Sequence, residues 1–153
     1  FRVPLLVQWK GKIAPGTTSD RVTGFEDWLP TLLELIGAKS AIPEGIDGLS
    51  FAPTLLGKQQ EARPFLYRES PGYGGQQCVR VGDWKAVRQR LQPGPRQKEK
   101  PEIVTELYHL GKDPFETTNI AAAHPDILQK LEQIMQREHT KSALWPIRAL
   151  DGE

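Results

Sequence analysis

One short apolar run near the start constrains the fold most: Val3 to Val7 is almost continuously hydrophobic. Such a run is typical of a strand covered on both faces, as in parallel sheets. Parallel strands need long crossover connections, and no second run like it occurs downstream to serve as a neighbour. An edge strand is the alternative, since Pro4 would be tolerated there. We favour the first interpretation, in which the partner strands belong to sequence upstream of Phe1.

The composition describes a globular chain with little to attract nucleic acid. Its 153 residues suffice for one ordinary domain, with 38% hydrophobic and 25% charged residues. The 20 basic residues balance 19 acidic ones, so the net charge of +1 offers no positive field to nucleic acid or anionic membranes. No apolar run approaches the ~20 residues that a membrane span needs. We therefore expect neither a nucleic-acid partner nor a membrane span.

A helix is expected after the first loop. Asp27 is the preferred cap, because Pro30 then lies in the first turn, where its missing N–H costs no hydrogen bond. A capping box from Thr23 to Glu26 is the alternative, and it would put Pro30 deep in the helix. Gly37 ends the helix. The apolar positions at helical spacing are Phe25, Trp28, Leu29, Leu32, Leu33 and Ile36.

The next segment, Ser40 to Leu56, predicts a loop followed by a short turn of helix. Asp47-Gly48 is expected to form a turn. Three apolar side chains are expected to be buried: Phe51, Leu55 and Leu56.

Four segments after this loop have sequence patterns typical of strands. The expected strands are Phe65–Glu69, Cys78–Val81, Trp84–Arg88 and Thr105–Leu110. Gly82-Asp83 predicts a two-residue hairpin turn, because glycine supplies the positive φ. Gln92 to Pro101 is expected to form a surface loop.

The expected helix runs from about Pro125 to His139, with the proline at its first position. One face carries apolar residues and is expected to cover the antiparallel sheet: Ile127, Leu128, Leu131, Ile134 and Met135. The predicted fold class is therefore α+β, with about four antiparallel strands packed by one long C-terminal helix. A strand and a helix from an α/β domain precede it. The boundary is expected between residues 1–60 and 61–153.

Six sequence fragments, in family order, resemble the formylglycine-dependent, arylsulfatase-like sulfatases of the alkaline-phosphatase superfamily. They are Arg2–Ile13, Asp27–Gly37, Asp47–Ser50, Val79–Lys85, Glu106–Tyr108, and Asp113–Glu116 with Asn119–Ala121. Two positions depart from the pattern: Lys10 stands where proline is usual, and His109 stands where aspartate is common. Neither position carries chemistry in that family.

The resemblance implies that residues 1–60 are the tail end of the catalytic α/β domain and 61–153 a C-terminal subdomain. In these enzymes a cysteine in a C-x-P-S-R motif becomes formylglycine, and Asp and Asn side chains hold Ca²⁺. Both features lie upstream of the matched stretch, so the resemblance implies no catalytic residue, no metal ligand and no cofactor in this chain. Cys78, the single cysteine, lacks the Pro-Ser-Arg context and is expected to be a buried strand residue.

The loop from Glu69 to Gln77 is the candidate substrate-binding segment. In bacterial sulfatases the matching loop leans over the active-site mouth, and the residues we expect to contact substrate are Glu69, Tyr73 and Gln76. Gly74-Gly75 would let the backbone approach a ligand closely. An exposed hairpin loop without such a role is the alternative.

The remaining polar candidates have simpler interpretations. The histidines are expected to be surface or cap residues: His109, His124 and His139. Asp47 and Asp113 each precede Gly or Pro and are expected to form turns rather than to bind metal.

We therefore expect a C-terminal fragment of a sulfuric ester hydrolase, inactive alone, that completes the fold and forms one wall of the substrate cleft. The alternatives are a fragment of a related phosphodiesterase or phosphonate hydrolase, and a stand-alone binding module. The expected partners are the missing catalytic domain of the same polypeptide and a sulfated small molecule or glycan. Copies of the chain could also associate through exposed apolar surface around Val3 to Trp9. Family habit implies a periplasmic or extracellular location.

Overall fold

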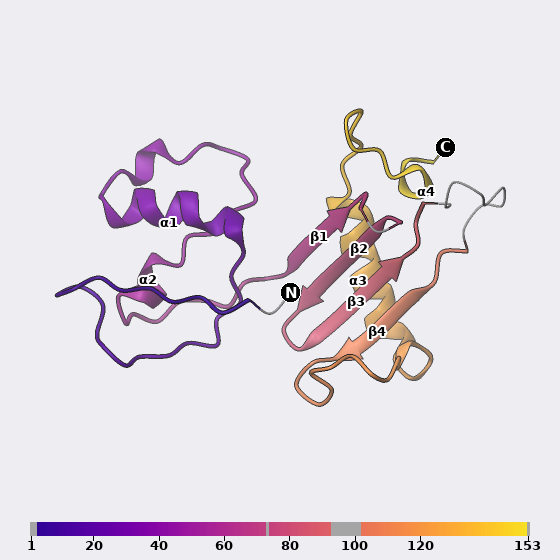
Figure 1. Ribbon diagram of the computed structural model, residues 1–153, viewed down its shortest axis with the longest axis horizontal. Helices are drawn as coiled ribbons and strands as arrows, with labels where there is room; N and C mark the ends of the chain where they lie inside the picture. Colours follow the sequence, from indigo (N-terminus) through magenta and orange to yellow (C-terminus); the bar gives the residue numbers. More distant parts are fainter. Residues whose placement is uncertain (1–2, 73, 93–101, 153) are drawn as a thin grey trace. The chain divides into compact units, whose positions relative to one another are not determined.

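The computed structural model describes residues 3–72, 74–92 and 102–152. The chain forms two compact units, Phe1–Arg63 and Pro64–Glu153 (Figure 1). None of the helices in the described part is long and apolar enough to cross a membrane.

The first unit is built from short helices and loops. A 3₁₀ turn, η1 (Phe25–Asp27), runs directly into α1 (Trp28–Leu35), and a second 3₁₀ turn, η2 (Lys39–Ala41), follows. A further short helix, α2 (Ala52–Leu55), completes the unit (Figure 1).

The predicted helix start is confirmed, because Asp27 is the N-cap of α1 and Pro30 lies in its first turn. The Asp27 side chain instead caps the preceding turn, where its Oδ2 accepts a hydrogen bond from the Gly24 backbone N–H at 2.8 Å. Gly37 follows the helix with a φ of +79°, a left-handed conformation that favours glycine. The Thr23–Glu26 alternative is not the observed cap.

The strand predicted at Val3 to Val7 is not formed. Residues 3–9 lie in neither helix nor strand, and Leu6 is 94% exposed. A strand requires a neighbour for its backbone hydrogen bonds, and the described residues of the first unit include no other strand.

Much of the predicted apolar face of α1 is also exposed. The exposed side chains are Phe25, Leu29, Leu32 and Ile36. Phe51 is buried as predicted, and its ring meets that of Trp28 edge-to-face, with 5.0 Å between centroids. Leu55 is only partly buried, and the prediction for Leu56 is wrong because this side chain is exposed.

The second unit contains a four-stranded antiparallel sheet in the order β1-β2-β3-β4 (Figure 1). Its strands are β1 (Leu66–Ser70), β2 (Gln76–Val81), β3 (Trp84–Gln89) and β4 (Thr105–His109). Each strand pairs with the next in sequence. The predicted α+β architecture is confirmed.

A single long helix, α3 (Pro125–Glu138), covers one face of this sheet (Figure 1). A 3₁₀ turn, η3 (Ala121–Ala123), precedes it, and a short helix, α4 (Arg148–Asp151), follows it. The predicted loop from Gln92 to Pro101 lies, apart from Gln92, outside the described residues.

The core of the second unit lies between the sheet and α3. Val79, Ala86 and Leu107 come from three adjacent strands, and each is fully buried. They pack against Leu131 and Met135, two members of the predicted apolar helix face. Each buried Val, Leu or Met side chain contributes roughly 1.5–3 kcal/mol through removal of apolar surface from water.

The hairpin between β2 and β3 is the one predicted. Val81 pairs with Trp84, so Gly82 and Asp83 alone form the turn. Gly82 has a φ of +55°, the conformation that this turn requires at its first position.

Candidate functional site

The predicted substrate-binding loop connects β1 to β2. Glu69 pairs with Gln77 across the two strands, and Ser70 pairs with Gln76. Side chains alternate between the faces of a pleated sheet, so Glu69 and Gln76 point to opposite faces. Tyr73, the third candidate, lies outside the described residues. The structure therefore brings Glu69 and Gln76 to the same end of the sheet but not to the same surface.

The two glycines of this loop approach the chain that follows β3. Gly74 and Gly75 have φ values of +80° and +78°. The carbonyl of Gly75 accepts a hydrogen bond from the Leu91 N–H at 3.1 Å, and that of Gly74 accepts one from the Gln92 N–H at 2.7 Å. A Cβ added to Gly75 would lie 3.0 Å from the Cβ of Leu91. These glycines thus let the backbone of the loop approach the chain that follows β3 closely.

Glu69 points to the face of the sheet that α3 covers, and its carboxylate is bound by one group from β1 and one from the end of α3. Its Oε2 accepts hydrogen bonds from the Tyr67 hydroxyl at 2.5 Å and from the ring Nδ1 of His139, 2.8 Å away. The Tyr67 oxygen in turn accepts a hydrogen bond from Gln77 Nε2 at 2.9 Å. Burial, reinforced by Glu69, raises the pKa of Tyr67, so the hydroxyl keeps its proton and acts as donor.

His139 lies between two carboxylates. Its Nδ1 contacts Glu69, and its Nε2 lies 3.1 Å from Oδ1 of Asp151, a residue only 6% exposed. Burial lowers the pKa of His139, but hydrogen bonds to Glu69 and Asp151 outweigh that effect and raise it above 6.5. His139 is the C-cap residue of α3, which agrees with the predicted cap role, but its two partners were not predicted.

The polar chain continues beneath α3. Gln77 is only 1% exposed, and its side-chain amide donates to the backbone carbonyl of Met135 at 3.1 Å. Its Oε1 accepts a hydrogen bond from Arg88 at 3.2 Å, and Arg88 also donates to Glu132 on α3 at 2.9 Å. The buried amide of Gln77 is therefore paired through both its nitrogen and its oxygen, which offsets the cost of removing it from water.

The opposite face of the sheet carries another ion pair. The ammonium of Lys85, a residue 7% exposed, lies 2.6 and 2.7 Å from the two carboxylate oxygens of Glu116. Glu116 has a φ of +57° in a turn shaped by Asp113, whose carboxylate accepts the Thr117 and Thr118 N–H groups. The hydrogen bond from the Thr118 backbone leads the effects that lower the pKa of Asp113. The predicted turn role of Asp113 is confirmed.

Asn119 connects the following segment to the outer edge of β4. Its Oδ1 accepts hydrogen bonds from the backbone N–H groups of Leu107 at 3.1 Å and Ala121 at 3.0 Å. The Ile120 N–H donates to the Leu107 carbonyl at 2.9 Å. The two remaining histidines pack edge-to-face on Trp84: His109 from the end of β4, and His124, the N-cap residue of α3.

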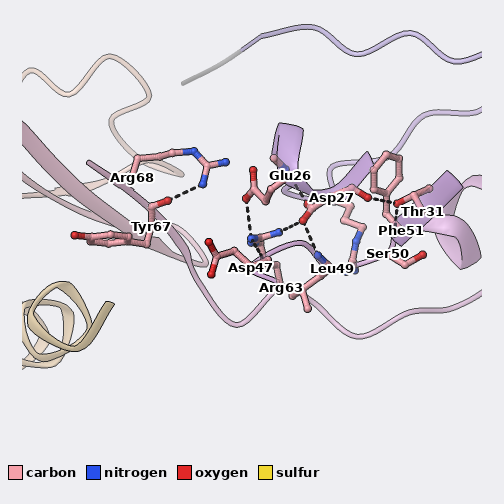
Figure 2. Close-up of polar contacts among 12 residues, drawn as sticks. Glu26, Asp27, Thr31, Asp47, Leu49, Ser50, Phe51, Arg63, Tyr67 and Arg68 are labelled. Atoms are coloured by element: carbon pink, nitrogen blue, oxygen red, sulfur yellow. Dashed lines mark hydrogen bonds and ion pairs between the residues drawn. The ribbon is translucent and has the colours of Figure 1, made fainter. Parts of the chain in front are cut away.

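In the first unit, Arg63 lies at the centre of a second polar cluster (Figure 2). Its guanidinium donates to Asp27 Oδ1 at 2.5 Å and to Glu26 Oε1 at 2.9 Å. The same Asp27 oxygen accepts the Leu49 N–H at 2.8 Å. Asp27 is 1% exposed and the Arg63 side chain 7%, so this is a buried ion pair.

A turn was predicted at Asp47-Gly48; the chain bends at Asp47 there, and Gly48 lies directly against this cluster. A Cβ added there would come within 2.2 Å of the Glu26 carbonyl oxygen. Only glycine fits, because the contact is with backbone rather than with a flexible side chain.

Several acidic and thiol groups of the described residues are already paired or buried. Among the residues that the structure describes, no group of three or more His, Cys, Asp or Glu is placed to hold a metal ion. The Asp27 and Asp113 carboxylates are engaged by Arg63 and by backbone N–H groups, so they do not fit a calcium site. Cys78 lies buried in β2 as predicted, and burial raises the pKa of its thiol to about 12. A thiol of this kind stays protonated near neutral pH and is a poor nucleophile.

A scan against protein-family models matches residues 1–141 to the family described as "N-sulphoglucosamine sulphohydrolase, C-terminal". The "Ulvan-active sulfatase" of Formosa agariphila is 30% identical over 161 residues, which cover 89% of this chain and 32% of that protein. "Arylsulfatase A" of Homo sapiens is 34% identical over 152 residues, which cover 87% of this chain and 29% of that protein. The chain thus spans about a third of the length of these curated relatives.

The crystal structure of Ps i-CgsB has a fold similar to that of this chain, with a TM-score of 0.62 at 20% sequence identity. The match covers 84% of this chain and 27% of that one. At this level of identity, the likeness concerns the fold alone.

Proposed function

Because this chain belongs to the family of N-sulphoglucosamine sulphohydrolase C-terminal domains, we propose that it is the carboxy-terminal part of a sulfatase, an enzyme that hydrolyses sulfuric esters. The match over residues 1–141 carries this proposal, and the curated relatives described above are sulfatases. The same match favours a sulfatase over a phosphodiesterase, a phosphonate hydrolase or a stand-alone binding module.

In this proposal the chain completes the fold of the enzyme and is inactive alone. Its first unit exposes many apolar side chains, among them Leu6 and the outer face of α1, and a catalytic domain would cover them. The buried, protonated Cys78 and the occupied carboxylates of Asp27 and Asp113 support a structural rather than a chemical role. Ca²⁺ and formylglycine, where the enzyme uses them, are then supplied from outside this chain.

We place one wall of the substrate cleft at the β1–β2 loop. Gln76 is the contact residue that the sheet geometry favours, because it points away from α3, and Tyr73 of the same loop is the second. Glu69 faces α3 instead, so it supports the loop from behind. The substrate is proposed to be a sulfated small molecule or glycan, in the periplasm or outside the cell. The name of the ulvan-active relative supports a glycan.

The proposal is tested with the purified chain and with the longer protein encoded by its reading frame. The chain alone should not hydrolyse 4-methylumbelliferyl sulfate, with or without added Ca²⁺. The longer protein should contain a C-x-P-S-R motif and hydrolyse that ester. Turnover by the chain alone that survives Cys78→Ala would refute the dependent role, and a longer protein that cleaves only phosphate diesters or phosphonates would refute the sulfatase assignment.

A further inference from the structure

The contacts of His139 require an unusual protonation state. A neutral imidazole carries one N–H and one lone pair, whereas an imidazolium carries two N–H groups. Here both ring nitrogens face carboxylate oxygens, Glu69 Oε2 at 2.8 Å and Asp151 Oδ1 at 3.1 Å. Only the imidazolium can donate to both. In the neutral ring, one nitrogen lone pair would face a carboxylate oxygen, and that contact would become repulsive.

The two carboxylates belong to parts of the second unit that are far apart in sequence. Glu69 lies in β1, whereas Asp151 lies in α4, at the end of the C-terminal segment that we define as residues 140–151. His139 itself directly follows α3. The imidazolium therefore ties this segment to the edge strand of the sheet.

Asp151 also holds α4 together. Its Oδ2 accepts the Ile147 N–H at 3.0 Å, and its own N–H donates to the Ile147 carbonyl at 3.0 Å. Lys141 donates to the Asp151 backbone carbonyl. Displacing the Asp151 carboxylate would thus loosen α4 as well as the contact with His139.

Two contacts without titratable groups attach the middle of the C-terminal segment to the rest of the second unit. Ile147 is 2% exposed, and Gln92 Nε2 donates to the Pro146 carbonyl at 2.8 Å. The segment would therefore stay attached at Pro146 and Ile147 while α4 opens.

We propose that His139 is a proton-dependent latch: the imidazolium fastens α4 to β1 through Asp151 and Glu69, and loss of its proton releases α4. The titratable and charged groups on the elements that meet at His139 are Tyr67, Arg68 and Glu69 on β1, Asp126, Lys130, Glu132, Arg137 and Glu138 on α3, and Lys141, Arg148 and Asp151 in the C-terminal segment. Arg137 and Glu138 pair with each other at 2.6 Å, and Tyr67 donates to Glu69. Of this set, Glu69 and Asp151 contact the ring.

The direction of the pH dependence follows from linkage. The folded-state pKa of His139 is raised above the 6.5 of the free side chain. The latch is therefore fully closed below about pH 6.5 and opens as pH rises through the folded-state pKa. One proton is involved, so the closed-to-open ratio changes at most about tenfold per pH unit.

Hydrogen exchange by NMR on the 153-residue chain between pH 5 and 9 tests the latch. The Ile147, Leu150 and Asp151 amides report α4, and the ¹⁵N shifts of the His139 ring report its protonation. After correction for intrinsic exchange, protection of these amides should fall together with ring deprotonation. His139→Gln carries its N–H groups on one nitrogen and an acceptor oxygen on the other side, so it cannot donate to both carboxylates and its α4 should be open at every pH.

Asp151→Asn is the decisive variant. The side-chain amide that this substitution introduces can donate to a neutral imidazole and still accept the Ile147 N–H, so α4 should stay protected at high pH. The proposal is overturned if wild-type protection does not change while His139 deprotonates, or if Asp151→Asn opens with the wild-type midpoint. Should His139→Gln fail to fold, the wild-type titration and Asp151→Asn still decide.

Discussion

At the scale of single residues, the stability of the first unit depends strongly on the side chain of Arg63. Its guanidinium compensates the buried carboxylate of Asp27, which also accepts a hydrogen bond from the Leu49 N–H. Removing one partner of a buried pair leaves an uncompensated charge, which costs far more than the pair contributes.

We therefore expect Arg63→Met to lower the free energy of unfolding of the first unit by about 3–5 kcal/mol. Arg80→Met is the matched control, because Arg80 lies 4.0 Å from the exposed Asp83 and should cost less than about 1 kcal/mol. Urea denaturation followed by tryptophan fluorescence measures both. Equal costs would show that the Arg63 pair is not an important constraint.

Gln76 carries the residue-scale prediction for substrate binding, which rests on the proposed sulfatase function. In the longer enzyme, Gln76→Ala should raise KM for a sulfated oligosaccharide several-fold while kcat for a small aryl sulfate stays unchanged. Gln89→Ala is the control, because Gln89 pairs with Gln76 across the sheet on the same face. Identical KM values for Gln76→Ala and the wild type would exclude Gln76 from the cleft wall.

At the scale of secondary-structure elements, the outer edge of β4 depends on Asn119. This side chain binds the backbone N–H of Leu107, a fully buried core residue, and that of Ala121. An edge strand presents unpaired backbone groups, and Asn119 with Ile120 satisfies them here.

Asn119→Leu should therefore destabilise the second unit by about 1–3 kcal/mol, because it leaves a buried backbone N–H without its acceptor. Asn119→Asp retains that acceptor and should cost less. Thermal unfolding and the exchange rate of the Leu107 amide give the two readouts. A loss in Asn119→Asp as large as that in Asn119→Leu would rule out the acceptor oxygen as the cause.

The elements of the second unit were predictable because their signals are local. Alternating apolar residues mark each strand, Gly82-Asp83 marks the hairpin, and Pro125 marks the start of α3. The bond between His139 and Glu69 carries no such signal, because it joins residues that only the fold brings together. The opposite orientation of Glu69 and Gln76 also depends on the β1–β2 pairing, which the sequence does not reveal.

At the scale of the whole molecule, the two units differ in how well they bury their apolar residues. The second has a continuous core of Val79, Ala86, Leu107, Leu131 and Met135. The first leaves large apolar side chains exposed along α1 and over residues 3–9. The Val3–Val7 run was predicted to be a strand because its apolar composition suits a covered position. It is exposed because the described residues of the first unit supply no partner strand.

We therefore expect the chain to bind a hydrophobic fluorescent dye such as ANS near neutral pH, and residues 64–153 alone to fold and bind far less of it. Dye titration measures the difference in dye binding between the two chains. Far-UV circular dichroism shows whether the shorter chain is folded. Equal dye binding by the full chain and by residues 64–153 would place the dye-binding surface in the second unit and contradict the expectation.

If the β1–β2 loop lines the substrate cleft as proposed, the pairing of these two strands has a consequence for how substrate preference could change. Five consecutive cross-strand pairs, from Leu66–Arg80 to Ser70–Gln76, fix the alignment of the two strands. The connection that follows Ser70 can therefore lengthen, shorten or change composition without shifting the core beneath it. The loop at this position can therefore vary in evolution while the paired strands that hold it keep their alignment.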